Sequence, residues 1–342
     1  MAVTRKGITK SKRTARRKVD AAAVRAALLA WYDTHHRTLP WREDTDAYRV
    51  WVSEIMLQQT RVETVIPYYQ RWLAKYPTIE ALAAADLQAV LKQWEGLGYY
   101  SRARNLHKAA GLVHERYQGR LPAEPSELRA LPGIGDYTAG AVASIAYNRP
   151  AAAVDGNVRR VLSRLYDVAA PTASAIRDCA VQLLDRDRPG DFNQALMELG
   201  ATVCSSRAPL CKDCPLRAAC CACANGTVSM RPGSKTKAPI PHERVHTLVR
   251  LHAARVLLAR RPDRGLLAGL WEFPEVAVAP ARAKFLGDIT HVFSHKRITY
   301  VVHRVNGYCR PQPGQQWVAL DKLHAYALPK AQRKIEKLLQ IS

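Results

Sequence analysis

Residues 131–141 read LPGIGDYTAGA, in which LPGIG is a short turn with two glycines, Gly133 and Gly135, between two stretches whose apolar residues have helical spacing. Glycines two residues apart let the backbone turn sharply and expose N–H groups just before the helix expected to begin near Tyr137. The dipole of that helix also favours an anion at this end. Such a turn is typical both of a plain connection between helices and of a hairpin whose amides bind one DNA phosphate.

The composition favours the second interpretation. The 342 residues include 52 lysines and arginines against 29 aspartates and glutamates, which gives a formal net charge of +23. An excess of this size is expected of a protein with a polyanionic partner, so we expect the turn to bind DNA. Because 48% of the residues are hydrophobic and 24% are charged, we expect two folded domains and exclude disorder over most of the chain.

Neither a membrane span nor a secretory signal is expected. The sequence has no run of about 18 uncharged apolar residues, and its first twenty residues carry basic side chains without an apolar core. These features predict a cytoplasmic, nucleoid-associated protein that does not contact a membrane.

The spacing of apolar residues predicts an all-helical domain over residues 19–224, for which Asp20 is a suitable first N-cap. Residues 1–18 hold eight lysines and arginines and no acid, so we expect a disordered basic tail there. The helices are expected at 21–33, 48–58, 62–75, 86–95, 101–117, 125–130, 137–147, 157–166, 173–186 and 191–203.

A change of pattern predicts a second, small α+β domain over residues 245–342. Residues 225–244 lack periodicity and are rich in Pro, Gly and Lys, as is typical of a linker. Beyond them, strands are expected at 245–252, 254–261 and 298–308, and a closing helix at 329–340.

Four cysteines follow the helical segments as Cys204-x6-Cys211-x2-Cys214-x5-Cys220. Disulfides are not expected in a reducing compartment. Structural zinc sites usually bring two close pairs of ligands together across a longer loop, whereas this is one compact loop over 204–220. The spacing therefore favours a [4Fe–4S] cluster over zinc. Cys221 and Cys223 are left over, and packing or unpaired thiols account for them.

Two acidic residues stand in places that suit catalysis. Glu54 lies on an expected amphipathic helix and shares a face with Trp51, Leu57 and Gln58. Burial on such a face disfavours the charged form of a carboxyl, which suits a general acid. Asp155 precedes an expected helix start in VDGNVRRVL, so it is either a plain N-cap or a second acid of the site.

Taken together, these motifs resemble the helix-hairpin-helix base-excision DNA glycosylases that carry an iron–sulfur cluster, and most closely the adenine DNA glycosylases of the MutY type. The resemblance covers residues 21–342. It rests on LPWR (39–42), SEIMLQQTRV (53–62), GLGYYSRARNLH (96–107), LPGIGDYTAGA, VDGNVRRVL (154–162), FNQALMELGA (192–201) and the four cysteines. It implies a monomer that acts on double-stranded DNA and removes adenine paired with 8-oxoguanine or guanine.

The resemblance also implies roles for individual residues. Glu54 corresponds to the general acid and base, and Asp155 to the aspartate that stabilises the sugar cation. Tyr137 stands where related bifunctional enzymes place a Schiff-base lysine, so base removal without efficient strand cleavage is implied. The wedge and base-pair readers correspond to Gln59, Thr60, Leu97 and Tyr99, and the adenine pocket to Trp41, Arg42 and Glu198.

The second domain resembles the Nudix-like 8-oxoguanine recognition domain of these enzymes, through LLARRPDRGLLAGLWEFPE (257–275) and HVFSHKR (291–297). The run of acids with which Nudix hydrolases hold magnesium is missing after Gly269. Recognition without pyrophosphatase activity is therefore implied, with Phe293, Ser294 and His295 as the residues that contact the oxidised base.

Three other functions compete with this interpretation. A pyrimidine-specific glycosylase/lyase of the same fold is disfavoured by Tyr137 and by the extra domain. A non-catalytic DNA-binding iron–sulfur protein requires Glu54 and Asp155 to be incidental. A Nudix hydrolase acting on free nucleotides is disfavoured by the missing acids.

Overall fold

The computed structural model describes residues 19–233 and 239–341. The basic tail expected over 1–18, and the part of the expected linker at 234–238, lie outside the described residues. The chain divides into two compact units, each built from two segments. Unit 1 comprises Met1–Arg37 and Asn148–Ser234, and unit 2 comprises Thr38–Tyr147 and Lys235–Ser342.

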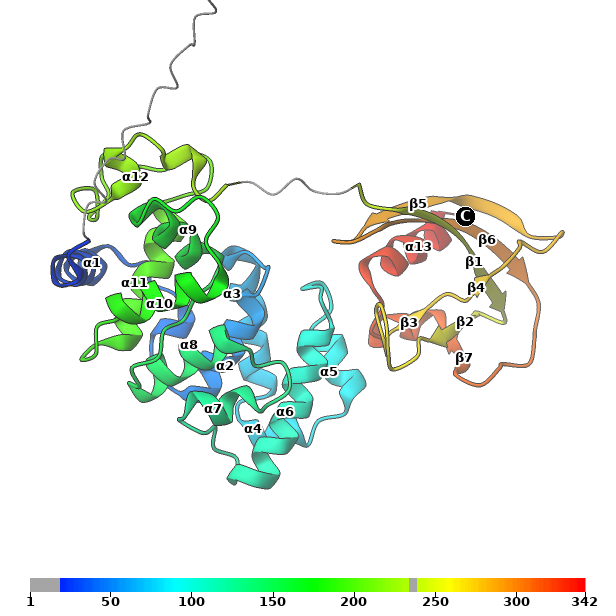
Figure 1. The fold of residues 1–342 in the computed structure, drawn as a ribbon. Coiled ribbons are helices and arrows are strands. Elements are labelled where there is room, and N and C mark those ends of the chain that lie inside the picture. Colours follow the sequence, from blue (N-terminus) through cyan, green and yellow to red (C-terminus); the bar gives the residue numbers. More distant parts are fainter. Residues whose placement is uncertain (1–18, 234–238, 342) are drawn as a thin grey trace, which may run out of the picture. The chain divides into compact units, whose positions relative to one another are not determined.

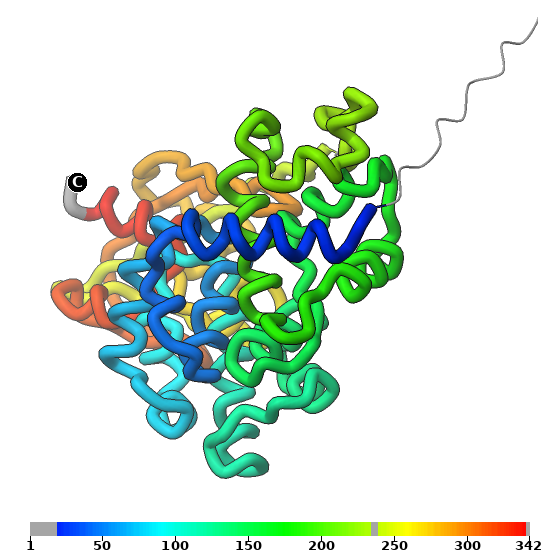
Figure 2. Tube along the Cα trace, turned by 90° about the vertical axis from the view of Figure 1, so that its left-hand side faces the viewer, coloured from blue at the N-terminus to red at the C-terminus, as the bar shows by residue number. Residues whose placement is uncertain are grey.

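Unit 1 is helical. Its elements are α1 (Ala21–His35), α9 (Gly156–Leu165), α10 (Ala173–Leu183), α11 (Pro189–Thr202), α12 (Cys221–Ala224) and the short 3-10 helix η2 (Val228–Met230). The Asp20 side chain caps α1 by accepting from the Ala22 amide at 2.9 Å, as its position in the sequence predicted. Figure 2 shows α1, in dark blue, lying across the green helices, in agreement with its contacts to α10 and α11. Leu28, Leu162 and Phe192 are fully buried between these helices.

Two helices of unit 1 approach each other closely at Gly200. A Cβ atom at this position of α11 would lie 2.6 Å from the Cβ of Asn157 on α9 and 3.2 Å from its backbone. Only glycine fits such an approach. The glycine in FNQALMELGA therefore sets the distance between α11 and the first turn of α9.

The first segment of unit 2 is also helical, and three fully buried tryptophans, Trp51, Trp72 and Trp94, form the centre of its core. Trp72 packs edge-on against Trp94 with ring centres 5.4 Å apart. The elements are η1 (Pro40–Arg42), α2 (Ala47–Leu57), α3 (Val62–Lys75), α4 (Ile79–Ala83), α5 (Leu87–Gln93), α6 (Ser101–Tyr117), α7 (Pro125–Arg129) and α8 (Asp136–Tyr147).

The second segment of unit 2 forms a mixed sheet with α13 (Lys330–Ile341) on one face (Figure 1). The strand order is β3-β2-β1-β6-β5, with β4 paired to β1 and β7 paired to β2. Strand β1 runs parallel to β6, and the other pairings are antiparallel. The strands are β1 (His242–His252), β2 (Arg255–Arg260), β3 (Trp271–Glu272), β4 (Glu275–Val276), β5 (Lys284–Val292), β6 (Arg297–Asn306) and β7 (Gln315–Ala319), followed by the 3-10 helix η3 (Leu320–Ala325).

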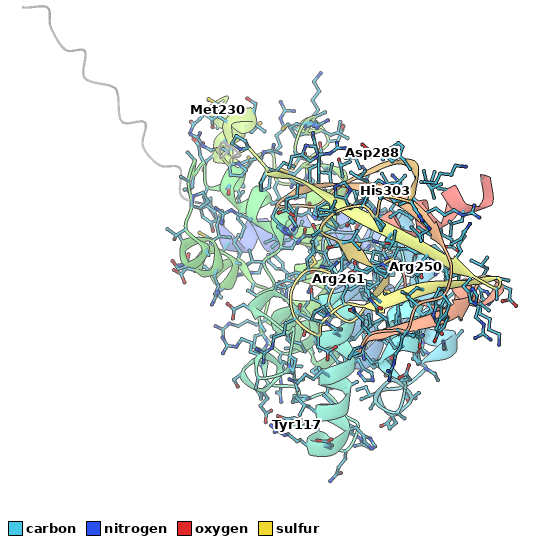
Figure 3. The ribbon with its side chains drawn as sticks, turned by 90° about the vertical axis from the view of Figure 1, so that its right-hand side faces the viewer. Tyr117, Met230, Arg250, Arg261, Asp288 and His303 are labelled. Atoms are coloured by element: carbon cyan, nitrogen blue, oxygen red, sulfur yellow. The ribbon has the colours of Figure 1, made fainter. Side chains whose placement is uncertain are left out.

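The two faces of this sheet differ in character. Val249, Tyr300 and Val302 point into a core that includes Ile335 of α13. Arg250 directly follows Val249 in β1, and His303 directly follows Val302 in β6; both are labelled, with Asp288, in Figure 3. Because successive residues of a strand point to opposite faces, Arg250 and His303 lie on the face away from this core.

The expected fold class is confirmed: an all-helical part precedes a small α+β part. Every expected helix is present within three residues of its predicted ends, and the strands at 245–252, 254–261 and 298–308 correspond to β1, β2 and β6. The short helix α4 and the strands β3, β4, β5 and β7 were not predicted. In the expected linker, residues 228–230 form η2 and residues 242–244 begin β1. No helix in the described ranges is long and apolar enough to cross a membrane.

Candidate active site

Glu54 lies on the buried face of α2. Seven consecutive residues, Val50–Met56, are buried in this helix, and Glu54 is only 6% exposed. Tyr137, in the first turn of α8, donates a hydrogen bond from its hydroxyl to Oε2 of Glu54. The two residues that the motifs singled out in α2 and α8 therefore contact each other directly.

The turn after α2 carries Gln58, Gln59 and Thr60. Nε2 of Gln58 donates to the Thr138 hydroxyl at 3.3 Å, which joins this turn to the first turn of α8. Gln59 is exposed and has φ +57°, in the left-handed region that non-glycine residues rarely adopt. The turn thus presents the Gln59 side chain from a constrained backbone.

A second turn, between α5 and α6, carries Leu97 and Tyr99. Leu97 is buried, whereas Tyr99 is 44% exposed and has φ +47°. Gly96 has φ +105°, and a Cβ there would lie 2.1 Å from the Tyr68 hydroxyl oxygen. Only glycine is compatible with this backbone, which explains the GLG sequence before Tyr99.

The LPGIG turn has the form of a hairpin between α7 and α8. Gly133 has φ +79°, and a Cβ there would lie 2.6 Å from the Cβ of Asn105 on α6. Gly135 accepts the first main-chain bond of α8 from the Ala139 amide at 2.9 Å. The amides of the first turn of α8 have no acceptor four residues earlier within the helix, which is the usual basis of an anion site.

The three residues expected to form a base pocket lie in different units. In unit 2, Trp41 is buried in η1 and packs edge-on against Tyr69 at 5.6 Å between ring centres, with Arg42 next to it in the sequence. In unit 1, Glu198 is 1% exposed and accepts hydrogen bonds from Nε of Arg37 at 2.7 Å and Nη2 at 3.0 Å. An ion pair therefore accounts for the burial of Glu198.

Asp155 is the N-cap of α9 in unit 1. Its Oδ1 accepts from the Val158 amide at 2.7 Å, and its Oδ2 accepts from Nδ2 of Asn157 at 2.9 Å. Burial raises the pKa of Asp155 above its ordinary value, while these hydrogen bonds oppose that rise by favouring the ionised form. The carboxylate is therefore both a helix cap and a partly desolvated acid with a fixed orientation.

A chain of hydrogen bonds leads from Asp155 to the first cysteine of the loop. Nη2 of Arg160 donates to Oδ1 of Asn157 at 2.8 Å and to the Gly200 carbonyl at 2.6 Å. Nε of Arg160 donates to the Cys204 carbonyl at 2.8 Å. The position of the Asp155 carboxylate thus depends on the same arginine that holds the start of the cysteine loop.

The four cysteines predicted as ligands are among the residues that line one cavity of about 30 Å³ in unit 1. Nη1 of Arg164 donates to Sγ of Cys204 at 3.3 Å and to the Ser205 carbonyl at 2.7 Å. Burial raises the pKa of the Cys214 thiol to about 12 and that of Cys220 to about 11. Four cysteines around one cavity, the first of which accepts a bond from Arg164, form a donor set that fits a metal group bound by thiolates.

The other two cysteines of the cluster differ in their surroundings. Cys221 is buried at the start of α12, whereas Cys223 lines the same cavity as the four predicted ligands. Within residues 19–233 and 239–341, no three His, Cys, Asp or Glu side chains are grouped as they are around a single metal ion.

The residues expected to contact an oxidised base form the tight connection between β5 and β6. The Phe293 amide donates to the Lys296 carbonyl at 2.8 Å, which closes the turn. Phe293 packs against the core of the sheet and lies edge-on to His291 at 4.6 Å. Ser294 and His295 are exposed at the tip.

Sequence reasoning missed the arginines and the asparagine that hold these groups. Asn157, Arg160 and Arg164 follow one another at spacings of three and four, so they lie along one side of α9. That spacing was a usable signal. The partners of Arg102 on α6 lie up to 47 residues away, so no local pattern pointed to it.

Comparisons with known proteins agree with the geometry. The family described as "HhH-GPD superfamily base excision DNA repair protein" matches residues 52–185, and the NUDIX domain family matches residues 245–338. The chain is 38% identical over 404 residues to the adenine DNA glycosylase of Mus musculus, covering 94% of this chain and 78% of that protein. It is 31% identical over 339 residues to the adenine DNA glycosylase of Buchnera aphidicola subsp. Schizaphis graminum, covering 92% and 97%.

Solved structures give the same fold for the helical part. A thermostable thymine-DNA glycosylase has a TM-score of 0.56 and 29% identity, covering 60% of this chain and 97% of that one. An endonuclease III trapped as a covalent intermediate with DNA has a TM-score of 0.53 and 24% identity, covering 61% and 99%.

The hydrogen bonds of Asp155 lead to a prediction about its ionisation. Replacing Asn157 with alanine removes the amide that donates to Oδ2. Since that bond stabilises the ionised carboxylate, its loss should raise the pKa of Asp155 further above the ordinary value. A ¹³C NMR titration of the aspartate carboxyl carbons measures the change, and the Asp20 cap serves as the internal control. An Asp155 titration that stays in place or moves to lower pH contradicts the prediction.

Proposed function

The chain belongs to the adenine DNA glycosylases, enzymes of base excision repair, and we propose that its substrate is adenine paired with 8-oxoguanine or guanine in double-stranded DNA. The observation that carries this proposal is the hydrogen bond from the Tyr137 hydroxyl to the buried carboxylate of Glu54. It supports an acid held in one orientation, next to a residue that cannot form a Schiff base.

Glu54 is proposed as the general acid. Adenine is a poor leaving group, and a proton delivered to the base weakens the bond that joins it to the sugar. Glu54 is buried, and the Tyr137 hydroxyl orients its carboxyl. After the bond breaks, the ionised Glu54 is the base that activates the attacking water.

Asp155 is proposed to stabilise the sugar cation that forms as the base leaves. An oxocarbenium ion is stabilised by a carboxylate close to it, as in glycoside hydrolysis. The bonds from the Val158 amide and from Asn157 favour the ionised form of Asp155, although burial opposes ionisation. A partly desolvated carboxylate interacts more strongly with a positive charge than one in water does.

The proposed product is an abasic site in an unbroken strand. Strand cleavage by related bifunctional enzymes proceeds through an amine of the protein that attacks the sugar. Tyr137 offers a hydroxyl and no amine, and this hydroxyl is already bonded to Glu54. We therefore infer that water, and not a side chain, is the nucleophile.

Binding to the duplex is proposed to involve the hairpin and the two exposed turns. Amides after Gly133 and Gly135 suit one phosphate. Gln59 and Tyr99 are exposed on constrained turns, so they suit the role of wedges that fill the stack after adenine has left it. Thr60 and Leu97 flank these wedges in the sequence, and Gln58, Trp41, Arg42 and Glu198 complete the proposed set of DNA- and adenine-contacting residues.

We also propose one [4Fe–4S] cluster bound by Cys204, Cys211, Cys214 and Cys220. These four residues line one cavity, and Arg164 donates a hydrogen bond to Sγ of Cys204. When bound, such a cluster supplies thiolate–iron bonds that hold the loop in one conformation.

The exposed tip of the β5–β6 connection is proposed to recognise 8-oxoguanine. This base differs from guanine at C8 and N7, where a carbonyl oxygen and an N–H replace a hydrogen and an acceptor. The Ser294 hydroxyl and the His295 imidazole lie side by side at the tip, 3.5 Å apart. Either group can form a hydrogen bond with the altered edge of the base.

The test of the proposed function is excision under single-turnover conditions. Glu54→Gln and Asp155→Asn should each slow adenine release from the 8-oxoguanine duplex by roughly 100-fold or more, because each removes a group used in the transition state. Duplex affinity should change little. Adding alkali should be required for strand breakage at the product.

Matched variants control for the chemical change itself. Glu63→Gln alters an exposed glutamate in the first turn of α3, and Asp86→Asn alters another N-cap, that of α5. Both should retain the rate of the unaltered chain. Excision within about tenfold of that rate in Glu54→Gln or Asp155→Asn removes the residue from the proposed mechanism. Release of an oxidised pyrimidine instead of adenine favours the pyrimidine-specific function.

The proposed cluster predicts about four iron atoms per chain, measured together with acid-labile sulfide. Cys214→Ser should lose most of the iron, because a ligand on the cavity is removed. Cys179→Ser, at a cysteine of α10, should keep it. One zinc and no iron in the purified chain contradicts the proposal.

The proposed reader of the oxidised base predicts a loss of selectivity. Ser294→Ala and His295→Ala should each reduce the preference for 8-oxoguanine over guanine by roughly threefold to tenfold, which corresponds to one hydrogen bond of about 0.5 to 1.5 kcal/mol. His324→Ala, which removes another exposed imidazole of the same segment, is the control. Excision of both mispairs is compared, and an equal decline on both argues that the tip has only a structural role.

A further inference from the structure

The guanidinium of Arg102, in the first turn of α6, is bonded to the backbone of two separate turns. The residue is 8% exposed. Its Nη1 donates to the carbonyls of Ile55 at 2.9 Å, Met56 at 2.9 Å and Gln58 at 2.6 Å. Its Nη2 donates to the Thr60 hydroxyl at 3.2 Å and to the carbonyls of Leu97 and Gly98, both at 3.1 Å.

Arg102 is a buried cation whose acceptors are all neutral. Its described hydrogen-bond partners are main-chain carbonyls and one hydroxyl, and none is a carboxylate. The carbonyls at the C-terminal end of α2 carry the negative end of that helix dipole. The guanidinium also lies over the rings of Trp94 at 5.2 Å and Tyr99 at 5.6 Å. Burial lowers the pKa of Arg102 to about 10, so the group is still charged at neutral pH.

Each of the two turns that Arg102 joins contains a residue with an unfavourable backbone conformation. Gln59 and Tyr99 have positive φ angles without being glycine, and such residues persist only where the surrounding structure holds them. Their side chains are also the exposed ones in these turns. A single guanidinium thus bonds to the residues that precede both of them.

We infer that Arg102 is a positioning residue that fixes the Gln59 and Tyr99 turns relative to each other, so that both side chains enter the duplex as one rigid wedge. The inference rests on the proposed function in one respect, namely that Gln59 and Tyr99 insert into DNA. A planar fork with five donors matches several carbonyls in two directions, and a lysine ammonium does not. A lysine at this position therefore keeps the positive charge but cannot bond to both turns at once.

Hydrogen exchange of the full chain tests the positioning without DNA. In Arg102→Lys, peptides covering 55–60 and 96–101 should exchange at least tenfold faster, while peptides from α1, α9 and α11 should exchange as in the unaltered chain. Arg116→Lys, the same change at an exposed position of α6, should have no effect. Faster exchange throughout the helical part, or no change in the two turns, overturns the inference.

Thr60→Val provides a milder test, because it removes one acceptor of Nη2 and leaves the charge in place. The exchange of 96–101 should then rise although the substitution lies in the other turn. Unchanged exchange of 96–101 in this variant shows that the guanidinium does not couple the turns.

The effect of Arg102 on wedge insertion is measured with duplexes that carry 2-aminopurine at the target position, where the fluorescence of this base increases when it is unstacked. Arg102→Lys should reduce both the fluorescence increase on binding and the single-turnover excision rate, the latter by at least tenfold. In a Gln59→Ala/Tyr99→Ala background the same substitution should cost less than threefold, because the groups that it positions are already gone. If Arg102→Lys slows excision by the same factor in both backgrounds, the inference is overturned.

The proposed function and the proposed role of Arg102 can be disproved independently of each other. If the unaltered chain neither unstacks nor releases adenine, the proposed function fails, and the exchange experiment still decides whether Arg102 couples the turns. If the unaltered chain is active and the effects of Arg102→Lys are independent of the wedge, only the role of Arg102 is lost.

Discussion

Bonds from arginine guanidinium groups to main-chain carbonyls hold turns and loops in each of the two units. Turns and helix ends leave carbonyls without partners, and burying them costs free energy unless donors are supplied. Arg102 supplies these donors to the turns of Gln59 and Tyr99. Arg160 and Arg164 supply them to the start of the cysteine loop. Irregular backbone can therefore be buried next to helices without losing a defined shape.

The two acidic residues, Glu54 and Asp155, differ in the groups that donate hydrogen bonds to them. Glu54 is buried in α2 and accepts a hydrogen bond from the Tyr137 phenol, which holds the carboxyl in one orientation. Asp155 caps a helix and accepts from an amide of the main chain and from Asn157, which suits a group that stays ionised. Since Asn157 is held by Arg160, the geometry of Asp155 depends on the cysteine loop through a bond to the Cys204 carbonyl.

The sequence allowed prediction of those parts that have a local signal. Apolar spacing predicted the helices, because each buries one face, and the cysteine spacing predicted a single loop that the structure gathers around one cavity. Strand β5 was missed because Phe285 and Val292, apolar residues in it, are exposed and obscure the alternation. The ion pair of Glu198 was not predicted, because its partner Arg37 lies 161 residues away and no local pattern reveals such a contact.

The proposed catalytic acid and the proposed reader of the oxidised base differ in their exposure to solvent. Glu54, the proposed general acid, is buried by the packing of α2, which keeps water away from its carboxyl. A group that reads the edge of a base must be reached by that base, and Ser294 and His295 stand at the exposed tip of a short turn. Phe293, packed on the sheet core, anchors that tip, so exposure there does not require a loose loop. Substitutions at the proposed reader of the oxidised base can therefore be made without disturbing the buried Glu54.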